Sequence, residues 1–251
     1  MEVHTHTHTS DPDSHRGRKK WTHYFWEFFM LFLAVTLGFF VENQREHLVE
    51  HRQEKQYMKL MREDLVTDTA QLQKSLADIT SSVSYIDSAL TYLVNAGTFV
   101  ENAKDAYRYT SNALKRIPVV FTDRTVTQLK NSGRMRIVRS QKVMDALTYY
   151  WNHIEIIRVS LDRHNHYRSM GRDLEIRIFN LAKDFLKDHQ FMTSHSGETR
   201  VAATNPGLIT EYANTFAYCG VVLEQAAVQL IQQQELAAKL IILIQEEYHL
   251  K

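Results

Sequence analysis

The sequence holds little glycine, proline or cysteine, and each shortage excludes a class of protein. In 251 residues there are 8 Gly, 3 Pro and one Cys. An all-β fold needs a turn residue about every 8 to 12 positions, and a phosphate-binding loop needs clustered glycines, so neither is expected. The single cysteine, Cys219, excludes an internal disulfide and any metal site with several cysteine ligands. Long helices are the default expectation.

A strong net charge is also absent, since the formal charge is +1. This balance argues against a globally basic nucleic-acid binder, and we expect no nucleic-acid partner. With 44% hydrophobic and 24% charged residues the chain can bury a core. It contains no nucleophile elbow, P-loop, dinucleotide fingerprint or paired-cysteine motif. We therefore expect neither catalysis nor a cofactor.

One long apolar run stands near the N-terminus. Residues 24–41 read YFWEFFMLFLAVTLGFFV and contain a single charge, Glu27. As a helix these 18 residues span about 27 Å, close to a hydrocarbon core of about 30 Å. The run predicts a transmembrane anchor over 21–42. No small-residue cleavage site follows it, so we expect it to stay attached.

The flanks of this run predict its orientation. Four basic residues precede it and mixed charges follow it, which places the N-terminus in the cytoplasm and the bulk of the chain outside. Residues 1–20 are polar and His-rich, and we expect a disordered cytoplasmic tail there. His4, His6, His8 and His15 could hold a transition metal weakly, but a solvated tail is the preferred interpretation.

Residues 43–251 are predicted to form a helical bundle. No Gly or Pro lies between Gly38 and Gly97, so the anchor helix should continue into this domain and end near Gly97. Its apolar positions form a coiled-coil stripe with alternating steps of three and four residues, in which only position 69 (Thr) is not apolar: Leu65, Leu72, Leu76, Ile79, Val83, Ile86, Leu90 and Leu93.

Four further helices are expected. Two are short, over about 101–117 and 123–132, ended by Pro118 and Gly133. A long one follows the N-cap Ser140, and the polar stretch 162–173 either interrupts it or is crossed by it. After a loop at 188–207, Asn205 and Pro206 open the last helix. Its stripe is Leu223, Ala227, Leu230, Gln234, Ala237, Ile241, Ile244 and Tyr248. The predicted fold class is all-α: an N-terminal transmembrane helix continuing into an elongated antiparallel helical bundle.

The order of these parts is similar to that of a known group of proteins. The parts are a basic leader, the apolar anchor, a charged helix, the turn formed by Thr125 and 129–133 (LKNSG), and a helix carrying Tyr149 and Tyr150. Over roughly residues 20–155 the chain resembles an uncharacterised family of single-pass, membrane-anchored helical proteins from Bacteroidota. The resemblance implies a cell-envelope location, hence a bacterial inner-membrane anchor with a periplasmic C-terminal domain, and implies no activity.

One motif suggests metal chemistry. His47, Glu50 and His51 form an H-x-x-E-H pattern, and Glu54 lies one turn further on the same helical face. The helix is crowded with basic residues close to the membrane, and a zinc peptidase needs an enclosing cleft and a further ligand. These four residues are therefore weak candidates, and no metal is expected.

Two other polar or reactive residues have competing interpretations. His164 continues the apolar stripe of the 140–161 helix and, with Asp162 and His166, could form a buried polar site. A helix that crosses a solvated zone explains these residues more simply. Cys219 has no basic activator nearby and is expected to be an inert core thiol.

Regional charge points to a possible contact surface. Residues 104–142 hold ten Lys and Arg against two Asp, whereas 42–103 and 205–251 are net acidic. These segments could neutralise one another within the bundle, which is the simpler interpretation. Alternatively they form a basic surface for an anionic partner. The candidate residues are Arg124, Lys130, Arg134, Arg136, Arg139 and Lys142.

Together these features favour a membrane-anchored scaffold or interaction protein, partnered by the lipid bilayer and by a protein of the membrane or periplasm. A ligand-sensing or regulatory subunit of a membrane complex is the alternative. The segment 43–64 has sparse apolar positions and abundant mixed charge, which suits one narrow contact seam. We therefore also expect a possible homo-oligomer joined along 43–64.

Overall fold

The computed structural model describes residues 16–94, 96–182, 201–202 and 205–250. Helices make up 88% of it, and the described ranges contain no strand, only an isolated bridge between Phe179 and Val201. The all-α prediction is confirmed at this level. The chain divides into two compact units, Met1–Glu54 and Lys55–Lys251.

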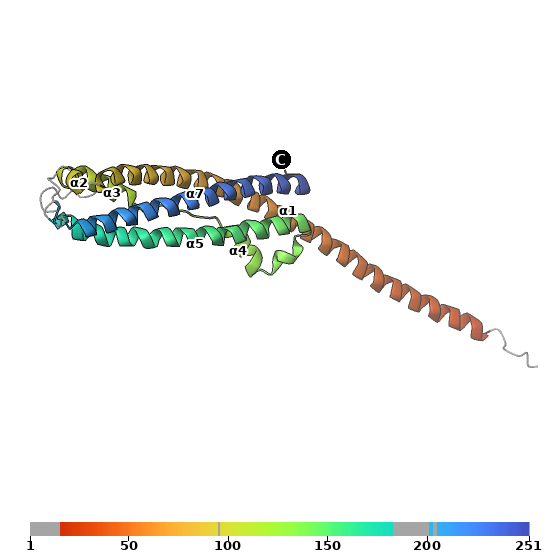
Figure 1. The fold of residues 1–251 in the computed structure, drawn as a ribbon. Helices are drawn as coiled ribbons and strands as arrows, with labels where there is room; N and C mark the ends of the chain where they lie inside the picture. The colour runs from red at the N-terminus through yellow and green to blue at the C-terminus, as the bar shows by residue number, and fades with distance from the viewer. Residues whose placement is uncertain (1–15, 95, 183–200, 203–204, 251) are drawn as a thin grey trace, which may run out of the picture. The chain divides into compact units, whose positions relative to one another are not determined.

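The first helix belongs to both units. α1 runs from Arg16 to Leu93 without a break (Figure 1). The prediction that the anchor helix continues past the apolar run is confirmed, although the helix ends at Leu93, and Gly97 lies inside the next helix. Helix also covers 16–20, the end of the predicted disordered tail. The rest of that tail, with its four histidines, lies outside the described residues.

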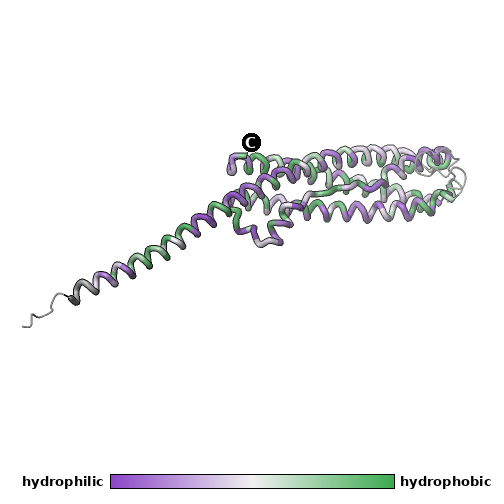
Figure 2. Tube along the Cα trace, turned by 180° about the vertical axis from the view of Figure 1, so that it is seen from behind, coloured by the Kyte–Doolittle hydropathy of each residue, from purple (hydrophilic) through white to green (hydrophobic). Residues whose placement is uncertain are grey.

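In the first unit, α1 is exposed throughout its apolar part. Every side chain from residue 21 to residue 49 is exposed. An 18-residue stretch has a mean hydropathy of 1.9, so α1 is long and apolar enough to cross a membrane. Figure 2 shows this stretch as the longest continuous hydrophobic part of the helix.

The second unit is built on three long helices that lie side by side (Figures 1 and 2). They are α1 from residue 55 onward, α5 (Gln141–Ile178) and α7 (Pro206–Tyr248). The first part of α5 and the last part of α7 share one core cluster, and the last part of α5 and the first part of α7 share the other. α7 is therefore antiparallel to α5, whereas α1 and α5 run in the same direction, since Tyr57 clusters with Tyr150 and Leu93 with Ile178.

The two apolar stripes predicted for the bundle form its core. On α1, Leu65, Leu72 and Ile79 are at most 2% exposed, and on α7 Leu223 and Leu230 are fully buried. Burying a Leu or Ile side chain contributes about 1.5–3 kcal/mol relative to exposure. The stripes are thus a main source of stability for this unit.

The segment between α1 and α5 differs from its prediction. Instead of one helix over 101–117 it holds α2 (Ala96–Glu101), α3 (Ala103–Ala113) and an extended stretch up to Asp123. The freed carbonyls bond to neighbouring helices: Ser82 donates to Ala113 O at 3.2 Å, and Ser75 donates to Pro118 O at 2.8 Å. These tertiary hydrogen bonds replace the missing helical ones.

The remaining boundaries agree with the sequence signals. α4 spans Arg124–Asn131, and the 3-10 turn η1 spans Arg134–Ile137. The Ser140 side chain caps α5 by accepting from Val143 N, and Asn205 caps α7 ahead of the proline at its first turn. α5 crosses 162–173 without interruption. Most of the predicted 188–207 loop lies outside the described residues.

Candidate functional site

The four weak metal candidates do not form a ligand cluster. His51 Nδ1 lies 3.4 Å from Glu54 Oε2, and the Glu54 side chain is 2% exposed. His47 is exposed. Among the described residues no group of three or more His, Cys, Asp or Glu is placed to hold a metal ion. The contact of His51 with Glu54 thus joins the pattern to a residue one turn beyond it.

The six basic candidates are all exposed, and several have intramolecular partners. Arg124 pairs with Asp64 at 2.6 Å, and Lys142 lies 3.8 Å from Glu247. Arg134 donates to the Tyr57 hydroxyl at 3.1 Å, and the Lys130 ammonium lies 5.3 Å from the Trp151 ring centre. Two of the six thus pair with carboxylates of α1 and α7, while all six side chains lie at the surface.

Two buried carboxylates of α1 organise this region, and the sequence analysis missed both. Asp64 accepts from Thr125 N at 3.0 Å in addition to its ion pair with Arg124. Asp68 accepts from Thr122 N at 2.6 Å and from the Tyr150 hydroxyl at 2.7 Å. Burial raises the pKa of Asp68, and the hydrogen bond from Thr122 N opposes that rise.

These contacts explain the turn formed by Thr125 and residues 129–133. Thr125 stands in the first turn of α4, where backbone N–H groups lack helical partners, and Asp64 supplies the acceptor. Leu129 is fully buried, and Gly133 has φ of +64°, which favours glycine. The motif is therefore structural. A usable signal was present, since Asp64 directly precedes Leu65 of the stripe and Asp68 directly precedes Thr69, the one position of the stripe that is not apolar.

A polar layer joins α5 to α7 beside this network. His153 Nδ1 lies 2.7 Å from Gln233 Oε1, and Gln233 Nε2 donates to Tyr150 O at 3.2 Å. Both side chains are buried. Because a buried amide must satisfy its donors and acceptor, this layer favours one register between the two helices.

The region predicted to be a solvated zone holds a buried histidine. His164 is only 2% exposed, so the solvated-zone interpretation is wrong for this residue, whereas His166 is exposed. Neither ring nitrogen of His164 has a hydrogen-bond partner among the described residues. Burial, with a smaller effect of Arg168, lowers the pKa of His164 to about 4. The imidazole is therefore neutral at pH 7.

The single cysteine is also buried, at 1% exposed. Burial raises the pKa of the Cys219 thiol to about 12, and the nearby Arg168 only partly opposes this. A thiol with so high a pKa holds almost no thiolate at neutral pH, and the thiolate is the reactive form. Cys219 is thus suited to packing, as the sequence analysis expected.

A third polar cluster, partly buried, ties the end of α3 to α5. Arg172 pairs with Glu175 at 2.6 Å and donates to Ser111 O and Leu114 O at the end of α3. The buried Thr110 hydroxyl donates to Tyr107 O at 3.0 Å within α3. Burial raises the pKa of Glu175, which Arg172 partly offsets. The cluster anchors the C-terminus of α3 and was not visible in the sequence pattern.

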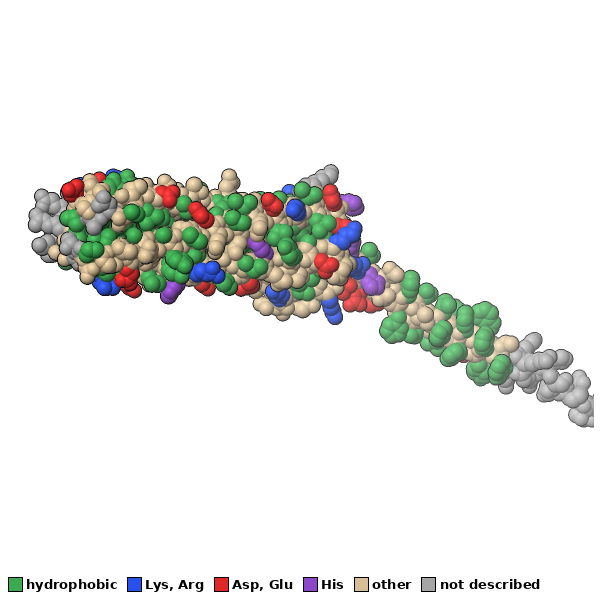
Figure 3. All heavy atoms as spheres, in the orientation of Figure 1, with side chains coloured by type: hydrophobic (Ala, Val, Ile, Leu, Met, Phe, Trp, Pro, Cys, Tyr) green, Lys and Arg blue, Asp and Glu red, His purple; other side chains and the backbone are tan. Residues whose placement is uncertain are grey.

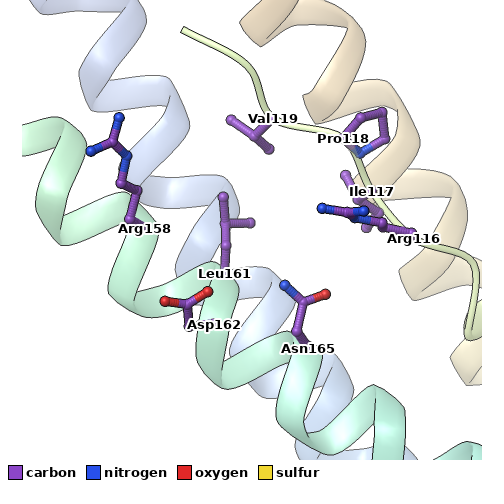
Figure 4. Close-up of a pocket in the computed structure, with 8 residues that line it drawn as sticks. All are labelled: Arg116, Ile117, Pro118, Val119, Arg158, Leu161, Asp162 and Asn165. Carbon is purple, nitrogen blue, oxygen red and sulfur yellow. The ribbon is translucent and has the colours of Figure 1, made fainter.

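Two shallow grooves flank the extended stretch after α3. One, of about 350 Å³, lies between this stretch and α5 and is shown in Figure 4. Its lining residues are Arg116, Ile117, Pro118, Val119, Arg158, Leu161, Asp162 and Asn165. The other, of about 260 Å³, lies on the α1 side and includes Asp78, Tyr85 and Lys115. Both are open and carry charges of both signs, without a convergent set of buried polar groups such as ligand sites use.

Comparison of the chain with protein-family models, curated proteins and solved structures finds no match in any of the three.

Proposed function

We propose that this protein is a membrane-anchored helical-bundle scaffold or interaction protein of the bacterial cell envelope, without a catalytic role. The observation that carries the proposal is the exposed apolar stretch of α1. The same helix continues into the core of the 55–251 unit. One helix thus holds an apolar segment suited to lipid and a face suited to protein.

The side chains of the apolar stretch support a lipid environment. Phe28, Leu31 and Phe39 are between 63% and 75% exposed, and large apolar residues surround them on all sides of the helix. Transfer of each such side chain out of water contributes about 1.5–3 kcal/mol. A hydrocarbon core of about 30 Å would cover this stretch.

We further propose an inner-membrane location with the N-terminus cytoplasmic and residues 43–251 in the periplasm. Arg16, Arg18, Lys19 and Lys20 precede the apolar stretch, and such basic flanks remain on the cytoplasmic side. Trp21, Tyr24 and Trp26 follow them at one end of the stretch, where amphipathic rings favour the headgroup region.

The bundle surface supports a role in binding other proteins. Apolar side chains are exposed on the outer faces of α5 and α7, among them Tyr149, Ile176, Tyr218 and Val228, each more than 50% exposed. Larger exposed apolar patches mark protein contact surfaces, and these four residues are candidates for one. The elongated bundle is in this proposal a platform for a partner in the membrane or periplasm.

Membrane fractionation and affinity purification test the proposal. The chain should remain in the pellet after alkaline carbonate extraction, and protease added to spheroplasts should remove residues 42–251. Purification from detergent-solubilised membranes should recover a stoichiometric partner. Release by carbonate, protection of the domain from protease, or purification of the chain alone would each contradict a separate part of the proposal. Stabilisation by a small ligand without any partner would favour a sensor.

A further inference from the structure

α7 carries a second heptad row on its outer side. Eight exposed residues of α7 each lie one position after a residue of the core-facing side. They repeat the same alternating steps of three and four residues. They are Ala217, Val221, Glu224, Val228, Ile231, Glu235, Ala238 and Ile242. Val228 and Ile242 are 55% and 54% exposed. A helix whose outer side only met water would not need a second apolar row.

α1 carries a matching row of mostly small residues. It also lies one position after the core stripe and follows the same alternation: Val66, Ala70, Gln73, Ala77, Thr80 and Ser84. All six are exposed. Small side chains allow another helix to approach closely, at interaxial distances of about 8 Å.

The contacts between α1 and α7 put the two rows on one face. Gln234 donates to Thr69 O at 3.3 Å, and a Cβ built at Gly220 would lie 3.6 Å from Ile86. These contacts fix an antiparallel register in which Ala77 lies near Val228. Each row lies one residue after the core-facing residues of its helix, which is a rotation of about 100° around the helix axis. Because the two helices are antiparallel neighbours, this rotation turns both rows to the same side of the pair. We call the two rows together the α1–α7 face.

The α1–α7 face is apolar and acidic. Its two rows contain no Lys or Arg, and Glu224 and Glu235 interrupt the apolar row of α7. Figure 3 shows hydrophobic side chains spread over the bundle surface, with charged ones set apart between them. The α7 row spans 25 residue steps, about 38 Å of helix. This is the footprint of one amphipathic helix of about 25 residues.

We propose that the α1–α7 face binds an amphipathic helix of a partner protein whose apolar seam carries Lys or Arg opposite Glu224 and Glu235. A second copy of this chain is the less favourable occupant, because its own face would bring acidic side chains against acidic ones. The proposal rests on the proposed interaction function and specifies the chemistry of the partner.

Site-specific photo-crosslinking in native membranes tests this assignment. A photoreactive residue is placed in the full-length protein at Ala77 or Val228, and at the equally exposed Val159 of α5 as the control. We expect a partner adduct at Ala77 and Val228 at least ten times stronger than at Val159. Mass spectrometry should map it to a helical segment with at least two Lys or Arg in its apolar seam.

Charge reversal provides the second arm. Glu224→Lys with Glu235→Lys should lower the Val228 adduct at least ten-fold, while Glu155→Lys with Asp173→Lys on α5 should change it less than two-fold. Thermal unfolding must match the parent in both double variants, since all four residues are exposed. An adduct to the same chain, to lipid or to a segment without basic residues overturns the proposal. So does an adduct no stronger than at Val159, or one unaffected by the reversal.

The failure of this inference can be told apart from the failure of the proposed function. If the partner still co-purifies while the α1–α7 face gives no specific adduct, the interaction function stands and the partner binds elsewhere. If no partner co-purifies, the function itself is wrong.

Discussion

Apolar side chains differ in exposure between two parts of the same helix, residues 21–41 and 57–93 of α1. In the first part every side chain is exposed, whatever its position around the helix. In the second, Leu65, Leu72 and Ile79 are buried and the residues one position later are exposed. The amount of apolar surface alone does not separate a lipid-facing helix from a core helix. Its distribution around the helix does.

The comparison also bears on residues 43–64, which overlap the second part, and the homo-oligomer expected along them stays a prediction. Residues 43–64 were predicted to hold a seam between copies of the chain, yet Tyr57, Met58 and Met61 are buried in the core of their own chain, Met58 completely. Leu48 and Val49 are exposed. A self-association seam through Met58 is therefore excluded by its packing, because its side chain is already covered within the chain.

The largest expected effect is a loss of folding stability when one charge is placed in the buried stripe of α1. Leu72→Asp should unfold the 55–251 unit or lower its free energy of unfolding by more than about 4 kcal/mol, because an unpaired charge replaces a fully buried side chain. Leu33→Asp, in the exposed apolar stretch, should leave the thermal midpoint in detergent unchanged and reduce membrane insertion. Circular dichroism and carbonate extraction measure the two effects. Equal melting of both variants would show that the periodic stripe is not core.

A second effect depends on pH and on His164. Its pKa is about 4 in the folded state and about 6.5 when unfolded. Below pH 6.5 the unfolded chain takes up the proton first, so stability falls as the pH drops from about 6.5 to about 4. The full loss is about 3 kcal/mol. Asp68 and Glu175 act in the opposite direction, since their raised pKa values favour the folded state at low pH.

A difference measurement isolates the histidine. Urea unfolding at pH 7 and pH 4.5 should show a smaller loss for His164→Leu than for the parent, and an unchanged loss for the exposed His166→Gln. If His164→Leu loses as much stability on acidification as the parent, the imidazole is not buried as a neutral group.

A smaller loss of stability is expected when the contact of Asp64 on α1 with the start of α4 is removed. Asp64→Ala should lower the free energy of unfolding by about 1–3 kcal/mol, because Thr125 N loses its acceptor at a buried position. Thermal or urea unfolding measures this loss, and hydrogen exchange at the start of α4 should accelerate with it. Retention of parental exchange rates there would contradict the capping role.

The smallest effect comes from the other side of the same ion pair. Arg124 is 63% exposed, and surface pairs contribute little, so Arg124→Ala should cost less than about 1 kcal/mol. Chemical unfolding of Asp64→Ala and Arg124→Ala, measured side by side, compares their losses in free energy of unfolding. A loss equal to that of Asp64→Ala would assign the stability to the ion pair and not to the cap.

The helices that pack by periodic apolar stripes could be predicted from the sequence, together with their caps. Ser140 and Asn205 cap α5 and α7 as expected, and the stripes through Leu72 and Leu230 are core. These features depend on local spacing and on single polar side chains at helix ends. They were therefore readable without knowing any tertiary contact.

The features that failed depend on partners far along the chain. α3 ends at Ala113, before the proline, and the carbonyls of Ala113, Leu114 and Pro118 accept hydrogen bonds from Ser82, Arg172 and Ser75. His164 is buried although its neighbours in sequence are polar. Asp64 and Asp68 meet residues 54 to 82 positions away. No local pattern records such contacts, which arise only when α1, α5 and the segment between them pack together.

The pairing of α1 with α7 has a consequence for synthesis. Thr69 and Gln234, which share a hydrogen bond, are 165 residues apart. At about 5–20 residues per second, α7 leaves the ribosome roughly 8 to 33 s after this part of α1. During that interval the apolar stripe at 65–93 has no α7 to cover it, while the upstream apolar stretch is already available for membrane insertion. A nascent chain stalled before residue 206 would therefore carry an uncovered stripe, a substrate for chaperones and proteases.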